Sequence, residues 1–150
     1  MPTLHELLAA PDRRSRVLTD CERLIDDEVA SKRGLTSIPV KAGFKVVKGL
    51  RPGFVRAAVD FLLDDFCGAL DPFYQRWASE DPASRPPLSE ALRRDADPVA
   101  DALLGVTDRR AQGSTNRVIV KTYQKLRGTA KGHVREALPG LGRTVEPYLR

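Results

Sequence analysis

The sequence predicts an all-α fold, a compact multi-helix bundle that forms one all-helical domain over residues 1–150. Apolar residues recur at helical spacing through almost the whole chain, and no segment alternates at period two for the length of a strand. Capping residues, prolines and glycines punctuate this pattern. A chain of 150 residues buries enough surface for one hydrophobic core. These observations predict seven to nine helices.

The first half begins with a capping box, because Thr3 is followed by Glu6, and this predicts a short first helix. A single apolar stripe over residues 17–29 predicts the second helix. The third helix is expected to open at Ser37 and to end at the break formed by residues 51–53, Arg-Pro-Gly.

The most apolar helix is predicted over residues 54–70. Asp71 followed by Pro72 has the pattern of a cap and a first-position proline, which predicts a new helix there. Residues 79–87 contain three prolines and predict the main internal loop. A short helix is expected over residues 88–92.

The Asp97-Pro98 pair repeats the cap-and-proline signal and predicts a helix that continues to Val106. A break at Gly113 and Ser114 precedes a helix over residues 118–126. The last two segments are predicted separately, over residues 134–138 and 141–148.

The chain contains a pattern of internal duplication, with halves predicted at residues 12–78 and 87–150. A shift of about half the chain aligns Phe44 with Val120 and Arg51 with Arg127. After a slip of one residue, the triplet at 71–73 aligns with that at 146–148. Two related helical units are therefore expected to pack through their apolar faces.

Charge is strongly sorted along the sequence. Residues 30–59 hold seven basic residues and no acid, and residues 109–135 hold eight and no acid. These 57 residues carry a net charge of +15, whereas the other 93 carry −10. A cationic helix face without neighbouring carboxylates suits phosphates or an acidic protein. The alternative is that acidic segments such as residues 26–28 pack beside the basic ones and neutralise them.

Basic positions recur in both halves at helical spacing. If the two segments lie side by side, they form one anion-binding face. The candidate anion-binding residues are Lys41, Lys45, Lys48, Arg51, Arg117, Lys121, Lys125 and Arg127.

Residues 29–44 also have features of a DNA-binding helix-turn-helix: a small residue four before Gly34, an apolar residue after it, a Thr-Ser capping pair, and an apolar residue that closes the pattern. Arg33 stands where an apolar residue should pack, and Pro39 and Gly43 weaken the second helix. Many ordinary helical corners share this pattern.

No pattern for catalysis, metal binding or cofactor binding is recognised, so no catalytic residue, metal or cofactor is predicted. Cys21 and Cys67 lie in apolar helical patterns, which predicts buried free thiols. The N-terminus lacks a signal-peptide pattern, and the apolar stretches are far below the ~18 residues of a membrane span. We therefore expect a cytoplasmic protein without integral membrane association.

Residues 41–56 and 69–73, with residues 123–127 and 134–139, resemble a family of small, uncharacterised helical bacterial proteins, a domain of unknown function. The resemblance covers most of the chain. It implies a helical fold and supplies no site.

The functional prediction is a non-catalytic binding protein whose basic helical face contacts nucleic acid, an acidic protein or anionic headgroups. The first alternative is a helical assembly or oligomerisation protein without a nucleic-acid role. The second is DNA binding through residues 29–44.

Overall fold

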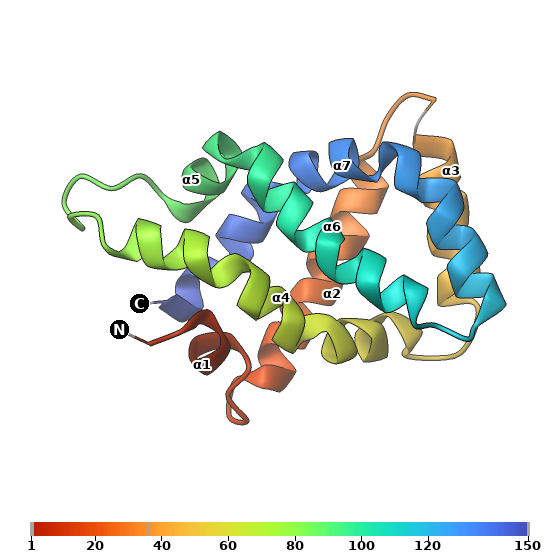
Figure 1. Ribbon diagram of the computed structural model, residues 1–150, viewed down its shortest axis with the longest axis horizontal. Coiled ribbons are helices and arrows are strands. Elements are labelled where there is room, and N and C mark those ends of the chain that lie inside the picture. The colour runs from red at the N-terminus through yellow and green to blue at the C-terminus, as the bar shows by residue number, and fades with distance from the viewer. Residues whose placement is uncertain (1, 36, 150) are drawn as a thin grey trace.

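The computed structural model describes residues 2–35 and 37–149, and it is an all-α bundle as the sequence predicts (Figure 1). The described part of the chain forms seven α-helices and one short 3-10 helix, and no strand. Within these ranges, none of the helices combines the length and the apolar character needed to cross a membrane. The elements are α1 Leu4–Leu8, α2 Arg14–Ser31, α3 Ser37–Lys48, α4 Phe54–Ala78, α5 Leu88–Arg94, α6 Ala96–Gln112, α7 Arg117–Val145 and η1 Glu146–Leu149.

Local capping signals set several of these helix boundaries. The Thr3 hydroxyl accepts a hydrogen bond from Glu6 N, and the Thr3 N–H donates to Glu6 Oε2, which confirms the predicted capping box. Gly53 adopts a left-handed φ of 73° directly before α4, so the predicted break after α3 is also confirmed. Asn116 caps the long helix α7 by accepting from the N–H groups of Val118 and Ile119.

Three predicted helix breaks are wrong, because α4 runs unbroken through Pro72 and α7 runs unbroken through residues 127–133 and through Pro139. An interior proline costs a helix about 3 kcal/mol. Burial on both sides of each proline offsets that cost: Leu70 and Tyr74 flank Pro72 in the core. The Asp71 carboxylate accepts a hydrogen bond from the Leu4 N–H at 2.8 Å, so it caps α1 instead of starting a new helix.

The hydrophobic core occupies one end of the molecule. It joins α1, the start of α2, the second half of α4, α5, α6 and the end of α7, and both chain ends lie there (Figure 1). Trp77 is anchored in it by donating from Nε1 to the Pro86 carbonyl at 2.8 Å, and the Arg85 guanidinium stacks on its ring. Cys21 and Cys67 are free thiols, half-buried and buried respectively.

Helix α3 contributes no hydrophobic side chain to this core, and Ser37 is its one buried residue among those described. It packs instead against α7, α2 and α4. We call this region the open end; it comprises α3, residues 54–62 of α4, residues 107–112 of α6 and residues 117–126 of α7. The molecule thus has a packed end and an open end.

The internal duplication stays a prediction. The first half contains α2, α3 and α4, and the second contains α5, α6 and α7. The aligned segments differ locally, because the chain breaks at residues 51–53 whereas α7 continues through the matching residues 127–129.

Candidate functional site

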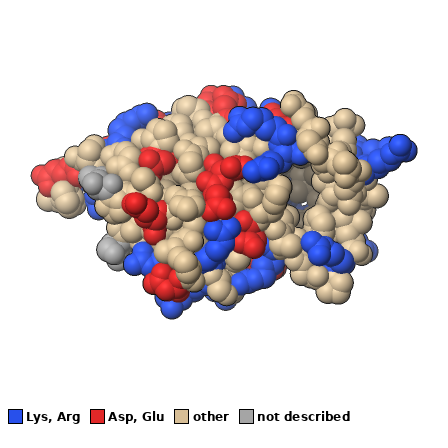
Figure 2. All heavy atoms as spheres, turned by 60° about the horizontal axis from the view of Figure 1, so that its bottom comes forward, with Lys and Arg blue, Asp and Glu red and all other residues tan. Residues whose placement is uncertain are grey.

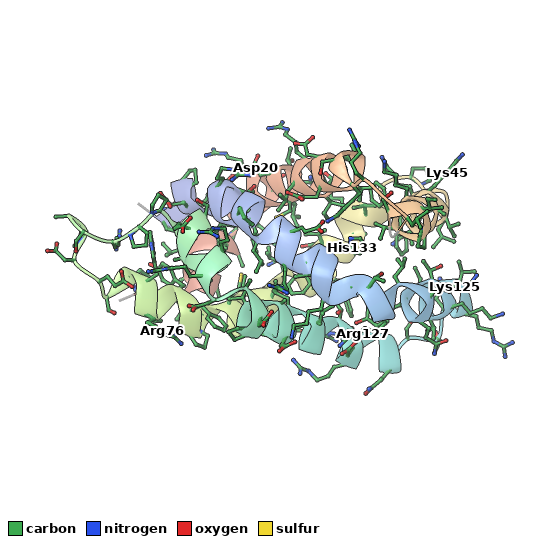
Figure 3. All side chains as sticks on the ribbon, turned by 90° about the horizontal axis from the view of Figure 1, so that it is seen from above. Asp20, Lys45, Arg76, Lys125, Arg127 and His133 are labelled. Atoms are coloured by element: carbon green, nitrogen blue, oxygen red, sulfur yellow. The ribbon has the colours of Figure 1, made fainter. Side chains whose placement is uncertain are left out.

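Both predicted basic segments lie at the open end. Seven of the eight candidate anion-binding residues are exposed, and Arg127 is half-buried. Figure 3 shows Lys45 and Lys125 at the same end of the molecule, whereas Arg127 lies toward α6. On the face drawn in Figure 2, acidic side chains gather away from this end. Elsewhere the fold pairs basic residues of the two acid-free segments with carboxylates, among them Arg56 with Glu22 and Arg135 with Asp97.

Carboxylates neutralise part of this set. Lys48 Nζ lies 3.3 Å from Asp26 Oδ1 in α2, and Arg127 Nε lies 2.9 Å from Asp108 Oδ1 in α6. Arg51 stacks on the Phe54 ring. Among the residues the structure describes, no carboxylate lies within 4.0 Å of the remaining five, which are Lys41, Lys45, Arg117, Lys121 and Lys125.

The lysines of α3 lie on the side of the helix away from α7. Gly43 marks the inner side, because a Cβ atom there would lie 3.1 Å from the side chains of Thr122 and Leu126. Lys41, Lys45 and Lys48 lie about 140–200° around the helix from Gly43. The basic residues of α3 and those of α7 therefore lie at the same end of the molecule. Those of α3 are on the side of that helix that faces away from α7.

An exposed apolar row runs beside the lysines of α3, and the sequence reasoning did not identify it. Ile38 is 63% exposed and Val46 is 49% exposed, and they lie just over two turns apart and about 80° apart around α3. Leu35, just before the helix, is 85% exposed. We define the α3 surface as Leu35, Ile38, Lys41, Lys45 and Val46. Exposed apolar side chains beside charged ones are typical of an interaction site.

The open end also contains a large apolar cavity between α3, α4, α6 and α7. Its volume is about 620 Å³, within the range of small-molecule sites. A hollow is visible at this end in Figure 2. Its described lining contains two arginines and no carboxylate. The residues are Val47, Arg51, Phe54, Ala57, Ala58, Phe61, Leu62, Thr107, Arg110, Ala111, Ser114, Asn116, Ile119, Thr122, Tyr123 and Leu126.

Small side chains at the centre of the lining explain the cavity. Phe54 and Phe61 are two turns apart on α4, with Ala57 and Ala58 between them on the same side. Ala111 of α6 lines the same space. The sequence predicts the most apolar helix over residues 54–70, in α4, but does not predict a cavity beside it. The width of its apolar face could have indicated the cavity. A helix that is apolar over so wide an arc has apolar neighbours on more than one side.

A polar network closes one edge of the cavity. The Tyr123 hydroxyl donates to Asp108 Oδ1 and lies 2.8 Å from Thr107 Oγ1, while Arg127 pairs with the same carboxylate. The hydrogen bonds from Arg127 and then from Tyr123 hold the pKa of Asp108 below its usual range. Burial, followed by the Asp108 hydrogen bond, raises the pKa of Tyr123. These groups satisfy one another, so the network is structural.

The corner between α2 and α3 has the helix-turn-helix outline that residues 29–44 predict. Gly34 turns the chain with a left-handed φ of 85°, and Thr36 lies outside the described residues. Lys32, only 7% exposed, anchors the corner to α7 through Glu136 Oε2 at 2.6 Å. Arg33 donates to backbone carbonyls instead of entering a core. DNA binding through this unit stays a prediction.

The described residues contain no cluster of three or more His, Cys, Asp or Glu side chains able to hold a metal ion. His133 has both ring nitrogens buried, without a hydrogen-bond partner in the described structure. Glu136, one turn further along α7, pairs with Lys32. The site features that remain are the α3 surface, the basic start of α7 and the cavity.

These features define a class of protein: an all-α bundle with a packed core at one end and an apolar cavity, flanked by exposed cations, at the other. The chain belongs to DUF6918, a family of unknown function, whose model matches residues 4–149. This membership confirms the resemblance to an uncharacterised family. Comparison with curated proteins and with solved structures gives no match.

Proposed function

We propose that this protein is a non-catalytic binding protein that contacts an acidic protein partner through the α3 surface and the basic start of α7. The observation that supports this most directly is the row formed by Ile38 and Val46, which is exposed beside the unneutralised Lys41 and Lys45. Apolar anchors flanked by cations fit an acidic amphipathic segment, which supplies both contacts.

The apolar row favours an acidic protein over nucleic acid as the partner. Phosphate backbones are contacted by cations and hydrogen-bond donors, and they gain nothing from Leu35 or Ile38 at the surface. A segment of protein with glutamates beside leucines covers the apolar row and neutralises the lysines together. The acidic protein is therefore favoured over nucleic acid.

The alternative of self-assembly through this surface is disfavoured by charge. A two-fold interface brings the same patch of both subunits together. Lys41 and Lys45 of one copy would then meet cations of the other. Such like-charge contacts oppose association.

The experiment compares two labelled probes by fluorescence anisotropy: a short helical peptide with glutamates beside a leucine stripe, and a DNA duplex. We expect the peptide to bind, and to bind more weakly as NaCl rises from about 50 to about 200 mM. Lys45→Glu and Ile38→Ser should each weaken peptide binding. Arg94→Glu in α5 at the packed end makes the same charge change as Lys45→Glu and should leave it unchanged.

Three results would contradict the proposal. The first is that the wild-type protein fails to bind the peptide at low salt. The second is that Arg94→Glu weakens binding as much as Lys45→Glu. The third is tight DNA binding that Lys45→Glu removes and Ile38→Ser leaves intact, which would assign the basic surface to nucleic acid.

A further inference from the structure

The cavity at the open end has the properties of a ligand site that the proposed protein contact does not use. Its walls are mostly apolar, and two of its polar side chains are already bonded: the Tyr123 hydroxyl to Thr107, and also to Asp108 outside the lining. An occupant therefore gains little from polar contacts along its body. The body of a matching ligand is apolar.

The charged groups in the lining are both cationic. Arg110 pairs with Asp65 at 2.6 Å and stacks on Phe61, so most of its charge is neutralised. Arg51 is exposed and stacks on Phe54, and no carboxylate of the described residues lies within 4.0 Å of it. A lining with an available guanidinium and no acid selects an anion.

The N-terminal end of α7 reinforces this preference. Asn116 lines the cavity and caps the helix, so the positive end of the α7 dipole lies beside the same space. Arg51 and the N-terminal end of α7 both border the cavity, and both favour an anionic occupant.

We propose that this cavity binds a small amphipathic anion, with its apolar body between α4, α6 and α7 and its carboxylate or phosphate group at Arg51. Phe54 and Phe61 flank the body, and Ala57, Ala58 and Ala111 leave room for it. The proposal goes beyond contact with an acidic protein and stands independently of it, because it uses none of the α3 surface.

The test measures displacement of anilinonaphthalene sulfonate, an apolar dye with an anionic group, by decanoate, decyl phosphate and decanol. We expect saturable binding, with at least one of the two anions tighter than decanol. The tighter anion identifies the headgroup. Equal affinity for all three would overturn the assignment of an anionic ligand, and absence of saturable binding would overturn the site itself.

Filling the cavity should remove binding. Ala58→Phe and Ala111→Leu should each weaken it by at least about tenfold, since these side chains occupy the space of the ligand body. Ala42→Phe adds the same bulk as Ala58→Phe at an exposed position of α3 outside the lining and should leave affinity unchanged. Circular dichroism checks that each variant is folded; wild-type affinity in either folded cavity variant would overturn the proposal.

The headgroup contact is tested by Arg51→Gln, which keeps a long polar side chain and removes the charge. We expect the affinity for the anion to fall about tenfold and that for decanol to stay constant. Lys41→Gln removes an exposed charge outside the lining and should change neither. An equal loss of anion affinity in both variants would assign the effect to net charge and would contradict a contact at Arg51.

Discussion

Gly142 of α7 lies directly against the backbone of Ser89 in α5: a Cβ atom at position 142 would lie 2.5 Å from both Cα and N of Ser89. Backbone atoms cannot move aside as the tip of a side chain can. This approach brings α5 and the end of α7 together over the packed core, and it requires a residue without a side chain.

We therefore expect Gly142→Ala to lower the free energy of unfolding by about 1–3 kcal/mol, the usual cost of overpacking. Gly132→Ala is the matched control, because it lies in the same helix with no atom within 4 Å of its added Cβ. It should stabilise the protein by about 0.5–1 kcal/mol. Denaturant unfolding measures both, and equal effects of the two variants would contradict the described contact.

Both cysteine thiols should be unreactive in the folded protein. Burial raises the pKa of Cys21 to about 11 and that of Cys67 to about 12, so little thiolate exists at pH 8. With Ellman's reagent we expect slow reaction in native buffer and rapid reaction of both thiols in guanidinium chloride. One thiol that reacts at once in the native protein would show that its helix packs differently.

The three tyrosines should ionise at a higher pH than a free tyrosine does. Burial raises the pKa of Tyr74, Tyr123 and Tyr148, and the hydrogen bond to Asp20 adds to burial in raising that of Tyr148 to about 12. The stability from Tyr148 is present below its ordinary pKa of about 10 and is lost as the pH rises toward 12. Absorbance titration should show no native tyrosine with a midpoint near 10, and Tyr148→Phe should flatten the alkaline fall in stability. An unchanged slope in this variant would contradict the Asp20 contact.

The network of Asp108 predicts the opposite pH dependence. Hydrogen bonds from Arg127 and then from Tyr123 lower the pKa of Asp108 in the folded protein. Its contribution to the free energy of unfolding is therefore fully present above the ordinary pKa of about 3.9, and it is lost as the pH falls through the lowered pKa. Asp108→Asn should flatten the acid dependence of the free energy of unfolding. Asp12→Asn, at an exposed turn where no described residue pairs with it, should retain the wild-type slope. If both variants behave as wild type, the network does not form in solution.

The sequence predicts the helices well and their interruptions less well. The Thr3 capping box and the break at residues 51–53 are local signals, and both are confirmed. Pro72 and Pro139 are local signals too, but burial along the two longest helices overrides them. Such burial depends on neighbours distant in sequence, so a local pattern cannot reveal it.

The candidate site, too, could be predicted from the sequence only in part. Acid-free segments are visible in the sequence, and six of the eight candidate residues in them have no carboxylate partner among the described residues. The alternative that residues 26–28 neutralise basic residues holds in part, because Lys48 pairs with Asp26, but which lysine pairs depends on how α2 meets α3. Ile38 and Val46 follow the same helical period as core residues, so periodicity alone could not place them outside. The cavity could not be predicted, because its lining comes from four helices that come together only when the chain folds.

The most direct test of the proposed protein contact is an amide ¹H–¹⁵N spectrum of the protein titrated with the acidic amphipathic peptide. Binding at the α3 surface and the start of α7 predicts shift changes confined to residues 35, 37–48 and 117–125. Changes centred on α5 and the packed core, or a spectrum that the peptide leaves unaltered, would contradict it.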